Sequence, residues 1–394
     1  MNIDFDALRD PDAPVPGARE RAGVDARARR LRARARMNRL ALSSVSVVAV
    51  VALAFGIVAS RRDTGPHVIV EGPSGASTTM PTPTTTTPLA TQSAPAVSAS
   101  WVSPSHGWAL ERDGTVVETT DGGVTWARVG SLKTNLAGTR MRFDDAEHGF
   151  VFDQRRLFTT SDGGASWVHA SYPVSQAFDF GVARGTVYTV GFDNSTTGFH
   201  IWSSPAAHMS WKEDPLSIQP GAGPVASFQF VFSGNVGWLL YVDRVDIASA
   251  RLTSAGRWVP WETPPCASAG GSGFLAASSA ADLVASCQEG VWTGPRITNG
   301  IYFSHDGGQT FTRGDAPNFG LVASPNGSTA VVPGSAGVER TTDGGATWQG
   351  VFDYGGSAVD LGFTTSTQGF IVFENGTMLM THDAGATWQE ETIP

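Results

Sequence analysis

An eight-residue pattern recurs along the C-terminal three quarters of the chain and constrains its fold more than any other feature. It consists of Ser or Thr, any residue, Asp, Gly, Gly, any residue, Thr or Ser, and an aromatic residue; we call it the repeat turn. Five good copies occupy residues 119–126, 160–167, 304–311, 341–348 and 381–388, the last with Ala384 in place of the first Gly. Self-similarity of this kind predicts a repeat architecture.

The spacing of the copies predicts seven units. Successive closing aromatic residues lie 41, 144, 37 and 40 residues apart, and the long step divides into three that average 48. Two eroded copies, at 203–211 and 253–258, fill that step. A second motif, Gly followed by an aromatic residue, precedes several copies and predicts a second turn in the unit: Gly107-Trp108, Gly149-Phe150, Gly237-Trp238 and Gly369-Phe370.

Each unit has the composition of four short strands. Residues 139–143, 149–152 and 157–160 are alternating or β-branched runs separated by turn residues. Four strands in roughly 40 to 45 residues is the period of a propeller blade, whereas helical solenoids need apolar residues three and four apart. We therefore predict an all-β fold: a seven-bladed β-propeller over residues 100–394, preceded by a single transmembrane helix and a disordered linker.

The repeat turn resembles the Asp-box, or bacterial neuraminidase repeat, of sialidases, sortilin-type receptors, some endoglucanases and a photosystem II assembly factor. The Gly-aromatic turn makes the assembly-factor-like and sortilin-like repeat proteins the nearest match. The resemblance covers about 295 residues, from 100 to 394. It implies a propeller and leaves the activity open, because functions diverge widely on this fold.

The residues of the repeat turn are expected to be structural. Asp accepts hydrogen bonds from backbone amides in turns, Gly supplies positive φ, and an aromatic ring covers a neighbouring apolar layer. A catalytic or metal site needs convergent groups, and these positions lie on separate blades. The structural set is Asp121, Asp162, Asp306, Asp343 and Asp383 with Trp126, Trp167, Trp348 and Trp388.

The N-terminal quarter predicts a membrane anchor. Residues 1–39 form an Arg-rich tail, residues 40–60 are 21 mostly apolar residues without a charge, and residues 61–99 are a linker rich in Thr, Pro and Ser. A helix over 40–60 would span roughly 30 Å, the thickness of a bilayer core. Nine arginines between Arg19 and Arg39 place the N-terminus in the cytoplasm by the positive-inside rule. A cleaved signal peptide is the alternative.

These features predict a single-pass protein of the cell membrane with an extracellular propeller. Beyond residue 62 the chain holds 15 basic and 30 acidic residues, a net charge of −15, which disfavours nucleic acid as a partner. In an oxidising compartment, Cys266 and Cys287 predict one disulfide.

The binding surface is expected on the face opposite the repeat turns, where the long loops gather. These loops are residues 191–200, 212–224, 261–273 and 288–300, and long loops on a rigid scaffold are where binding usually resides. Candidate contact residues are Phe192, Phe199, Trp292, Arg296 and Tyr354; loop packing is the alternative role for each.

The sequence leaves the question of catalysis open. It lacks the Arg-Ile-Pro signature of sialidases, but Asp144, Asp145, Asp179 and Asp360 follow or lie within expected inner strands and keep a two-carboxylate glycoside hydrolase as the alternative. For Asp144 and Asp145 a turn-forming role is favoured. The eight histidines show no ligand spacing, so we expect no metal and no cofactor. The favoured function is a non-catalytic binding or assembly scaffold for a protein or a cell-envelope glycan.

Overall fold

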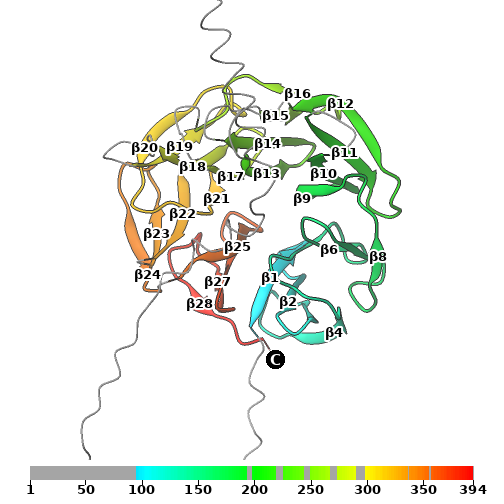
Figure 1. Cartoon of the computed structure of the whole chain (residues 1–394). Helices are drawn as coiled ribbons and strands as arrows, with labels where there is room; N and C mark the ends of the chain where they lie inside the picture. Colours follow the sequence, from blue (N-terminus) through cyan, green and yellow to red (C-terminus); the bar gives the residue numbers. More distant parts are fainter. Residues whose placement is uncertain are drawn as a thin grey trace, which may run out of the picture. The chain divides into compact units, whose positions relative to one another are not determined.

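The computed structural model shows a ring of seven four-stranded antiparallel sheets (Figure 1). It describes residues 95–192, 198–218, 225–243, 249–266, 273–289, 298–335, 337–354 and 356–393. Each sheet contains four consecutive strands, so the prediction of an all-β, seven-bladed propeller is confirmed. None of the residues described here belongs to a helix long and apolar enough to cross a membrane, and the predicted span at 40–60 lies outside them.

The strands follow one another blade by blade, from the inner to the outer strand of each sheet. Blade 1 contains β1 (Ala96–Trp101), β2 (Gly107–Glu111), β3 (Thr115–Thr119) and β4 (Ala127–Ser131). Blade 2 contains β5 (Arg140–Phe143), β6 (Gly149–Phe152), β7 (Leu157–Thr160) and β8 (Val168–Ala170). Blade 3 contains β9 (Gln176–Ala183), β10 (Thr186–Phe192), β11 (Phe199–Pro205) and β12 (Lys212–Ile218). Blade 4 contains β13 (Val225–Ser233), β14 (Val236–Asp243), β15 (Ser249–Leu252) and β16 (Trp258–Trp261).

The remaining three blades repeat this order. Blade 5 contains β17 (Gly273–Ala277), β18 (Leu283–Glu289), β19 (Thr298–Ser304) and β20 (Thr312–Asp315). Blade 6 contains β21 (Ala323–Asn326), β22 (Thr329–Gly334), β23 (Gly337–Thr341) and β24 (Gln349–Phe352). Blade 7 contains β25 (Ala358–Phe363), β26 (Gly369–Phe373), β27 (Met378–Thr381) and β28 (Gln389–Glu390).

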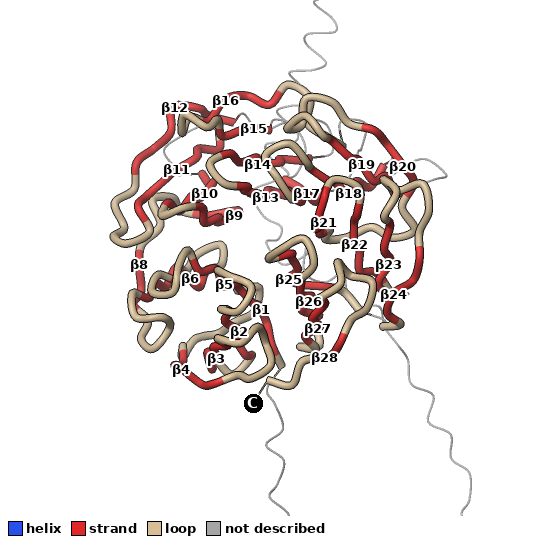
Figure 2. The backbone as a smooth tube through the Cα atoms, turned by 180° about the vertical axis from the view of Figure 1, so that it is seen from behind, coloured by secondary structure: helices blue, strands red, loops and turns tan. Residues whose placement is uncertain are grey.

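The first strand of every blade faces the centre of the ring and the fourth lies at its rim (Figure 2). The ring closes between blades 7 and 1 without a shared strand, because β1 belongs to a sheet made only of β1 to β4. Ala96 donates its backbone N–H to the Gly376 carbonyl at 3.1 Å, and the Arg112 guanidinium donates to the Glu374 carbonyl at 2.6 Å. Packing between β1 and blade 7 buries side chains of both, including Ala99 and Val372.

Hydrogen bonds between turns define two faces of the ring. In blade 1 the Gly122 N–H of the repeat turn donates to the Ser105 carbonyl in the turn between the first two strands, at 2.9 Å. Equivalent bonds join the same two turns in blades 2, 5, 6 and 7. We call this side the repeat-turn face. The turns between second and third strands and the links between blades lie on the other side, the loop face.

The repeat turns share one hydrogen-bond pattern. In the first, Asp121 accepts from the Thr119 hydroxyl, the Thr125 N–H and the Thr125 hydroxyl at 2.6 to 2.8 Å, and the Gly123 N–H donates to the Thr119 hydroxyl at 2.9 Å. Corresponding bonds recur at Asp162, Asp306, Asp343 and Asp383. The residue after each Asp has positive φ, including Ala384 at 60°.

The Gly-aromatic motif reflects a cross-strand contact in four blades. Gly107, Gly149, Gly237 and Gly369 each pair with an aromatic residue that ends or nearly ends the first strand. In blade 2 a Cβ atom at Gly149 would lie 2.5 Å from the Phe143 ring. Glycine is needed at this position because the aromatic ring occupies the space that a side chain of the residue would fill. The ring also covers the backbone of the glycine, which would otherwise be exposed.

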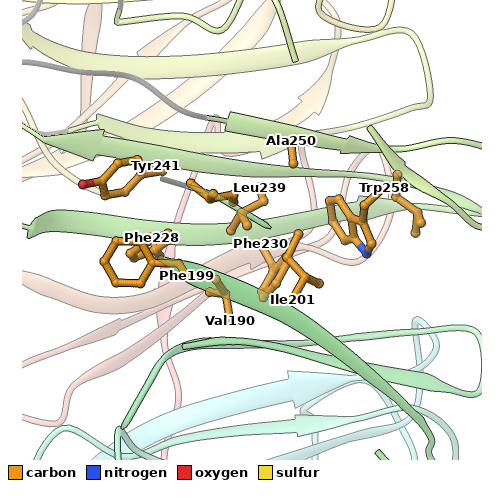
Figure 3. Packing of buried hydrophobic residues seen from close by; sticks show 11 residues of the cluster. Val190, Phe199, Ile201, Phe228, Phe230, Leu239, Tyr241, Ala250 and Trp258 are labelled. Carbon is orange, nitrogen blue, oxygen red and sulfur yellow. The ribbon is translucent and has the colours of Figure 1, made fainter. Parts of the chain in front are cut away.

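Aromatic side chains fill the seams between blades. Figure 3 shows the seam of blades 3 and 4, where Phe199 packs among Phe228, Tyr241 and Ile201. The Phe199 and Phe228 ring centroids are 4.7 Å apart. Phe199 is only 4% exposed, so its role as a surface contact is corrected to that of a core residue. It begins β11, where strand alternation turns its side chain toward the next blade.

Two expected boundaries differ from the structure. The propeller begins with β1 at Ala96 rather than at residue 100, because the small residues of β1 resemble those of the linker in composition. Residues 212–218 form strand β12 rather than a long loop. β12 is an outer strand with mostly exposed charged and polar side chains, so it lacks the apolar alternation by which buried strands are recognised.

Candidate functional site

Polar side chains of the inner strands connect one blade to the next around the central channel. The inner strands are edge strands, whose unpaired N–H groups need acceptors. Asp179 of β9 accepts the Phe230 N–H of β13 at 2.6 Å. Gln229 of β13 accepts the Leu275 N–H of β17 at 2.7 Å and donates to the Leu275 carbonyl at 2.9 Å. These side chains therefore have a structural role.

The most complete of these connections joins blades 7, 1 and 2. The Arg142 guanidinium of β5 forms two hydrogen bonds with the Asp360 carboxylate of β25, at 2.7 and 2.8 Å. The Ser98 hydroxyl donates to the same carboxylate at 2.6 Å. Burial alone would raise the pKa of Asp360, but the charge and hydrogen bonds of Arg142 hold it below its usual value. Asp360 is thus an ionised, fully occupied carboxylate.

Asp179 has a different environment. Burial raises its pKa above the usual range, and the charges of Arg140 and Arg142, with backbone N–H donors, only partly offset this effect. Arg140 and Arg142 both project from β5 into the channel, where a cavity of about 220 Å³ is also lined by Gln229 and Asp360. The channel therefore holds two arginines and two aspartates. The pKa of Asp179 is raised, whereas the pKa of Asp360 is lowered.

A groove crosses the loop face over blades 7, 1 and 2. Three cavities, of about 600, 530 and 190 Å³, meet at Gly138 in the link between blades 1 and 2. Gly138 has φ of 69°, and a Cβ atom built on it would meet no atom within 4 Å. The two larger cavities form what we call the Gly138 groove, and the smallest opens beside it. The lining of the groove includes Ala96, Arg112, Thr134 to Thr139, Asp153 to Arg156, Phe373 and Glu374.

Hydrogen bonds hold the groove in shape. Arg156 donates to the Thr134 hydroxyl and to the Asn135 carbonyl, both at 2.6 Å, and forms an ion pair with Asp153. These contacts tie the link between blades 1 and 2 to the second hairpin of blade 2. Arg112 and Arg155 are exposed at the groove. The groove lining holds three arginines against two acidic residues, Asp153 and Glu374, a small positive excess on a chain whose charge beyond residue 62 is strongly negative.

The predicted contact residues do not gather in this groove. Phe192 is partly buried against the aromatic cluster of blades 3 and 4, and Tyr354 packs on Phe373 with ring centroids 4.3 Å apart. Trp292 and Arg296 lie outside the described residues. Phe373 lines the groove, so Tyr354 stands behind one of its walls.

Asp144 and Asp145 lie on the repeat-turn face, away from the channel mouth. Asp144 accepts the Gly185 N–H of blade 3 at 2.8 Å, and Asp145 accepts the N–H groups of Glu147 and His148 within its own turn. Among the residues that the structure describes, no group of three or more His, Cys, Asp or Glu side chains is arranged to hold a metal ion.

Cys266 and Cys287 form a disulfide. Cys266 lies in the link that leads to blade 5 and Cys287 in β18, and both are buried in the seam of blades 4 and 5. The bond therefore ties a link on the loop face to the second strand of blade 5.

Sequence reasoning missed Arg140, Arg142 and Gly138. A signal for the two arginines was present, because they alternate with Met141 and Phe143 in the first strand of blade 2. That alternation places both arginines on one side of the strand. Gly138 had no such signal, since the groove depends on how three loops meet.

Comparisons with known proteins identify the fold. No family model matches the chain, and no curated protein sequence matches it. A structure described as YCF48 bound to D1 peptide superposes with a TM-score of 0.51 at 18% identity, covering 74% of this chain and 94% of the other. YCF48 from Cyanidioschyzon merolae gives 0.52 at 18% identity, covering 75% and 97%. Hydrazine synthase of Kuenenia stuttgartiensis gives 0.55 at 10% identity, covering 76% and 99%.

At these identities the similarity establishes the fold alone. The chain is a seven-bladed propeller structurally similar to YCF48, which agrees with the resemblance of its repeats to an assembly-factor-like propeller.

Proposed function

We propose that this protein is a membrane-anchored, extracytoplasmic binding scaffold whose Gly138 groove takes a segment of a partner protein. Residues 40–60 would be the anchor, with residues 1–39 in the cytoplasm. The observation that carries the proposal is the convergence of three cavities at Gly138, rimmed by exposed arginines on a rigid ring. One structural relative is described as bound to a peptide, which supports a protein ligand.

The geometry of the channel favours binding over glycoside hydrolysis. A hydrolase needs one carboxyl group as acid and a second, available carboxylate as base or nucleophile. Asp360 is engaged by Arg142 and Ser98, and Asp144 and Asp145 lie on the opposite face. A cell-envelope glycan remains the second ligand class, favoured by the aromatic side chains beside Asp179 at the channel mouth.

A pair of matched glycine variants tests the proposal. Gly138→Asn places a side chain in the groove, and Asn tolerates the positive φ of this position. Gly256→Asn is the control, because Gly256 has φ of 73°, equally open space, and a position in the eroded copy of the repeat turn, between the third and fourth strands of blade 4. The tagged full chain would be captured from its own solubilised envelope, with glycan hydrolysis assayed in the same eluate.

We expect a partner protein to be recovered with the wild type and with G256N, but at least tenfold less with G138N. Equal recovery with both variants would contradict binding in the groove. Hydrolysis of a glycan by the wild type would favour the enzyme instead.

A further inference from the structure

A small pocket lies at the mouth of the central channel, between blades 2 and 3. It measures about 190 Å³ and is lined by Arg140, Asp179, Gln154 and the rings of Phe152, Tyr172 and Phe178, among others. We call it the channel-mouth pocket. It opens on the loop face beside the Gly138 groove, with Gly138 in both linings.

Arg140 and Asp179 face this pocket from neighbouring inner strands without touching each other. The charge of Arg140 lowers the pKa of Asp179, which burial raises more strongly. Yet no hydrogen bond, and no ion pair within 4.0 Å, joins the Arg140 guanidinium to Asp179 or to any other described residue. The Asp179 carboxyl group accepts the Phe230 N–H at 2.6 Å, and the Phe180 N–H is a second backbone donor that favours its charged form.

The neighbouring Arg142–Asp360 pair shows what a closed pair looks like in this channel. There the guanidinium and carboxylate are in direct contact at 2.7 and 2.8 Å, and a serine hydroxyl completes the arrangement. The same two residue types, one alternation step away on β5, are therefore closed at one site and open at the other. In the open pair the Arg140 guanidinium and the Asp179 carboxyl group do not bond to each other. Polar groups in a partly buried pocket are stabilised when a hydrogen-bonding partner occupies the space between them.

A ligand that fills the space between Arg140 and Asp179 must accept hydrogen bonds from the guanidinium and donate one to the carboxyl group. Both functions must lie on the same small chemical group. A hydroxyl group does both, and two adjacent hydroxyls on a sugar ring reach two such groups together. The aromatic walls suit the C–H faces of such a ring, as apolar and aromatic lining with a few placed polar groups is the usual composition of a ligand pocket. The pocket is of a size for a single ring rather than for a peptide chain.

We propose that the channel-mouth pocket binds one sugar ring of a cell-envelope glycan through adjacent hydroxyls held by Arg140 and Asp179. This inference rests on the proposed binding function of the loop face. It names a second ligand beside the protein segment of the Gly138 groove. The aromatic rings of Tyr172 and Phe178 contact the ring of the sugar.

The test uses methyl glycosides of glucose, galactose, mannose and arabinose, and of N-acetylglucosamine, as probes. They are titrated against the full chain in a detergent without a sugar headgroup, with saturation-transfer NMR as the readout. Single rings bind weakly, so dissociation constants in the millimolar range are expected. At least one probe should bind saturably to the wild type.

Two conservative variants and one control locate the binding. Arg140→Gln and Asp179→Asn should each raise the dissociation constant of that probe at least tenfold. The amide introduced by D179N keeps an oxygen that accepts the Phe230 N–H. Arg155→Gln changes an exposed residue of the groove outside the pocket and should leave sugar binding unchanged. Folding of each variant is checked by the unfolding temperature.

The outcomes separate this inference from the proposed function. No saturable binding of any probe up to about 20 mM, or binding that survives both R140Q and D179N, overturns the sugar pocket. If protein capture still depends on Gly138 in that case, only the pocket is lost. If sugar binding depends on Arg140 and Asp179 but protein capture is unchanged by G138N, the pocket stands and the protein groove does not.

Discussion

Replacing Asp360 by Asn keeps the shape of the side chain but leaves Arg142 without its counter-charge. Asp360 is 3% exposed and Arg142 is 30% exposed at the side chain, so the pair is buried on one side only. Removing one partner of a fully buried pair costs about 3 to 5 kcal/mol. With the partial exposure of Arg142, we expect about 2 to 3 kcal/mol, or roughly 5 °C in unfolding temperature for a domain of this size.

The assay is thermal unfolding of the full chain in detergent, followed by near-UV circular dichroism. Asp315→Asn is the matched control: Asp315 also pairs with an arginine, Arg313, at 2.7 Å, but its side chain is 88% exposed. Exposed pairs contribute little, so D315N should shift the unfolding temperature by less than about 1 °C. Equal shifts for D360N and D315N would refute the reasoning.

The difference in stability between the wild type and D360N should change with pH in a defined direction. The pKa of Asp360 is lowered in the folded state, so its stabilisation is present above the unfolded value of 3.8 and is lost as the pH falls through the folded-state pKa. The stability gap between wild type and D360N should therefore narrow on acidification below about pH 4. A gap that widens there would contradict the assignment of charge.

Three further predictions concern the propeller. Burial and the charge of Asp113 raise the pKa of Glu111 from 4.5 to about 7. The free energy of unfolding of the wild type should therefore fall relative to that of Glu111→Gln, by up to about 3 kcal/mol, as the pH rises from about 4.5 to 7. Urea titrations that give a constant difference between the two proteins across that range would contradict this prediction. Reducing the Cys266–Cys287 disulfide, which closes a separation of 21 residues, should lower the free energy of unfolding by about 3 kcal/mol, measured by denaturant titration with and without reductant; no change would show that the bond does not constrain the unfolded chain. Gly149→Ala places a Cβ atom 2.5 Å from the Phe143 ring and should cost about 1 to 3 kcal/mol in the same titration, whereas an unchanged midpoint would mean that the ring moves freely.

The number of blades could be predicted because the repeat turn is a local structure. Its Asp, Gly and Thr residues bond to one another within a few positions, as in Asp121 with Thr119 and Thr125. Such a turn leaves the same trace in the sequence wherever it occurs. Strand β12 was missed because an exposed outer strand needs no apolar alternation.

The candidate site could be predicted only in part. The loop face could be predicted from the strand order, but the ion pair of Arg142 and Asp360 in the channel could not. Ser98 and Asp360 are separated by 262 positions and Arg142 and Asp360 by 218, and ring closure alone brings them together. Phe199 was misassigned because a residue that begins a strand next to a loop has the same sequence context whether it faces solvent or the next blade.

The most direct test of a partner-binding loop face is site-specific photo-crosslinking in living cells. A benzophenone amino acid replaces Ala137, which lines the Gly138 groove, or Val124, which is 81% exposed in the repeat turn of blade 1. We predict a discrete covalent adduct with a partner protein from position 137 and none from position 124. An adduct from position 124 alone would contradict the account.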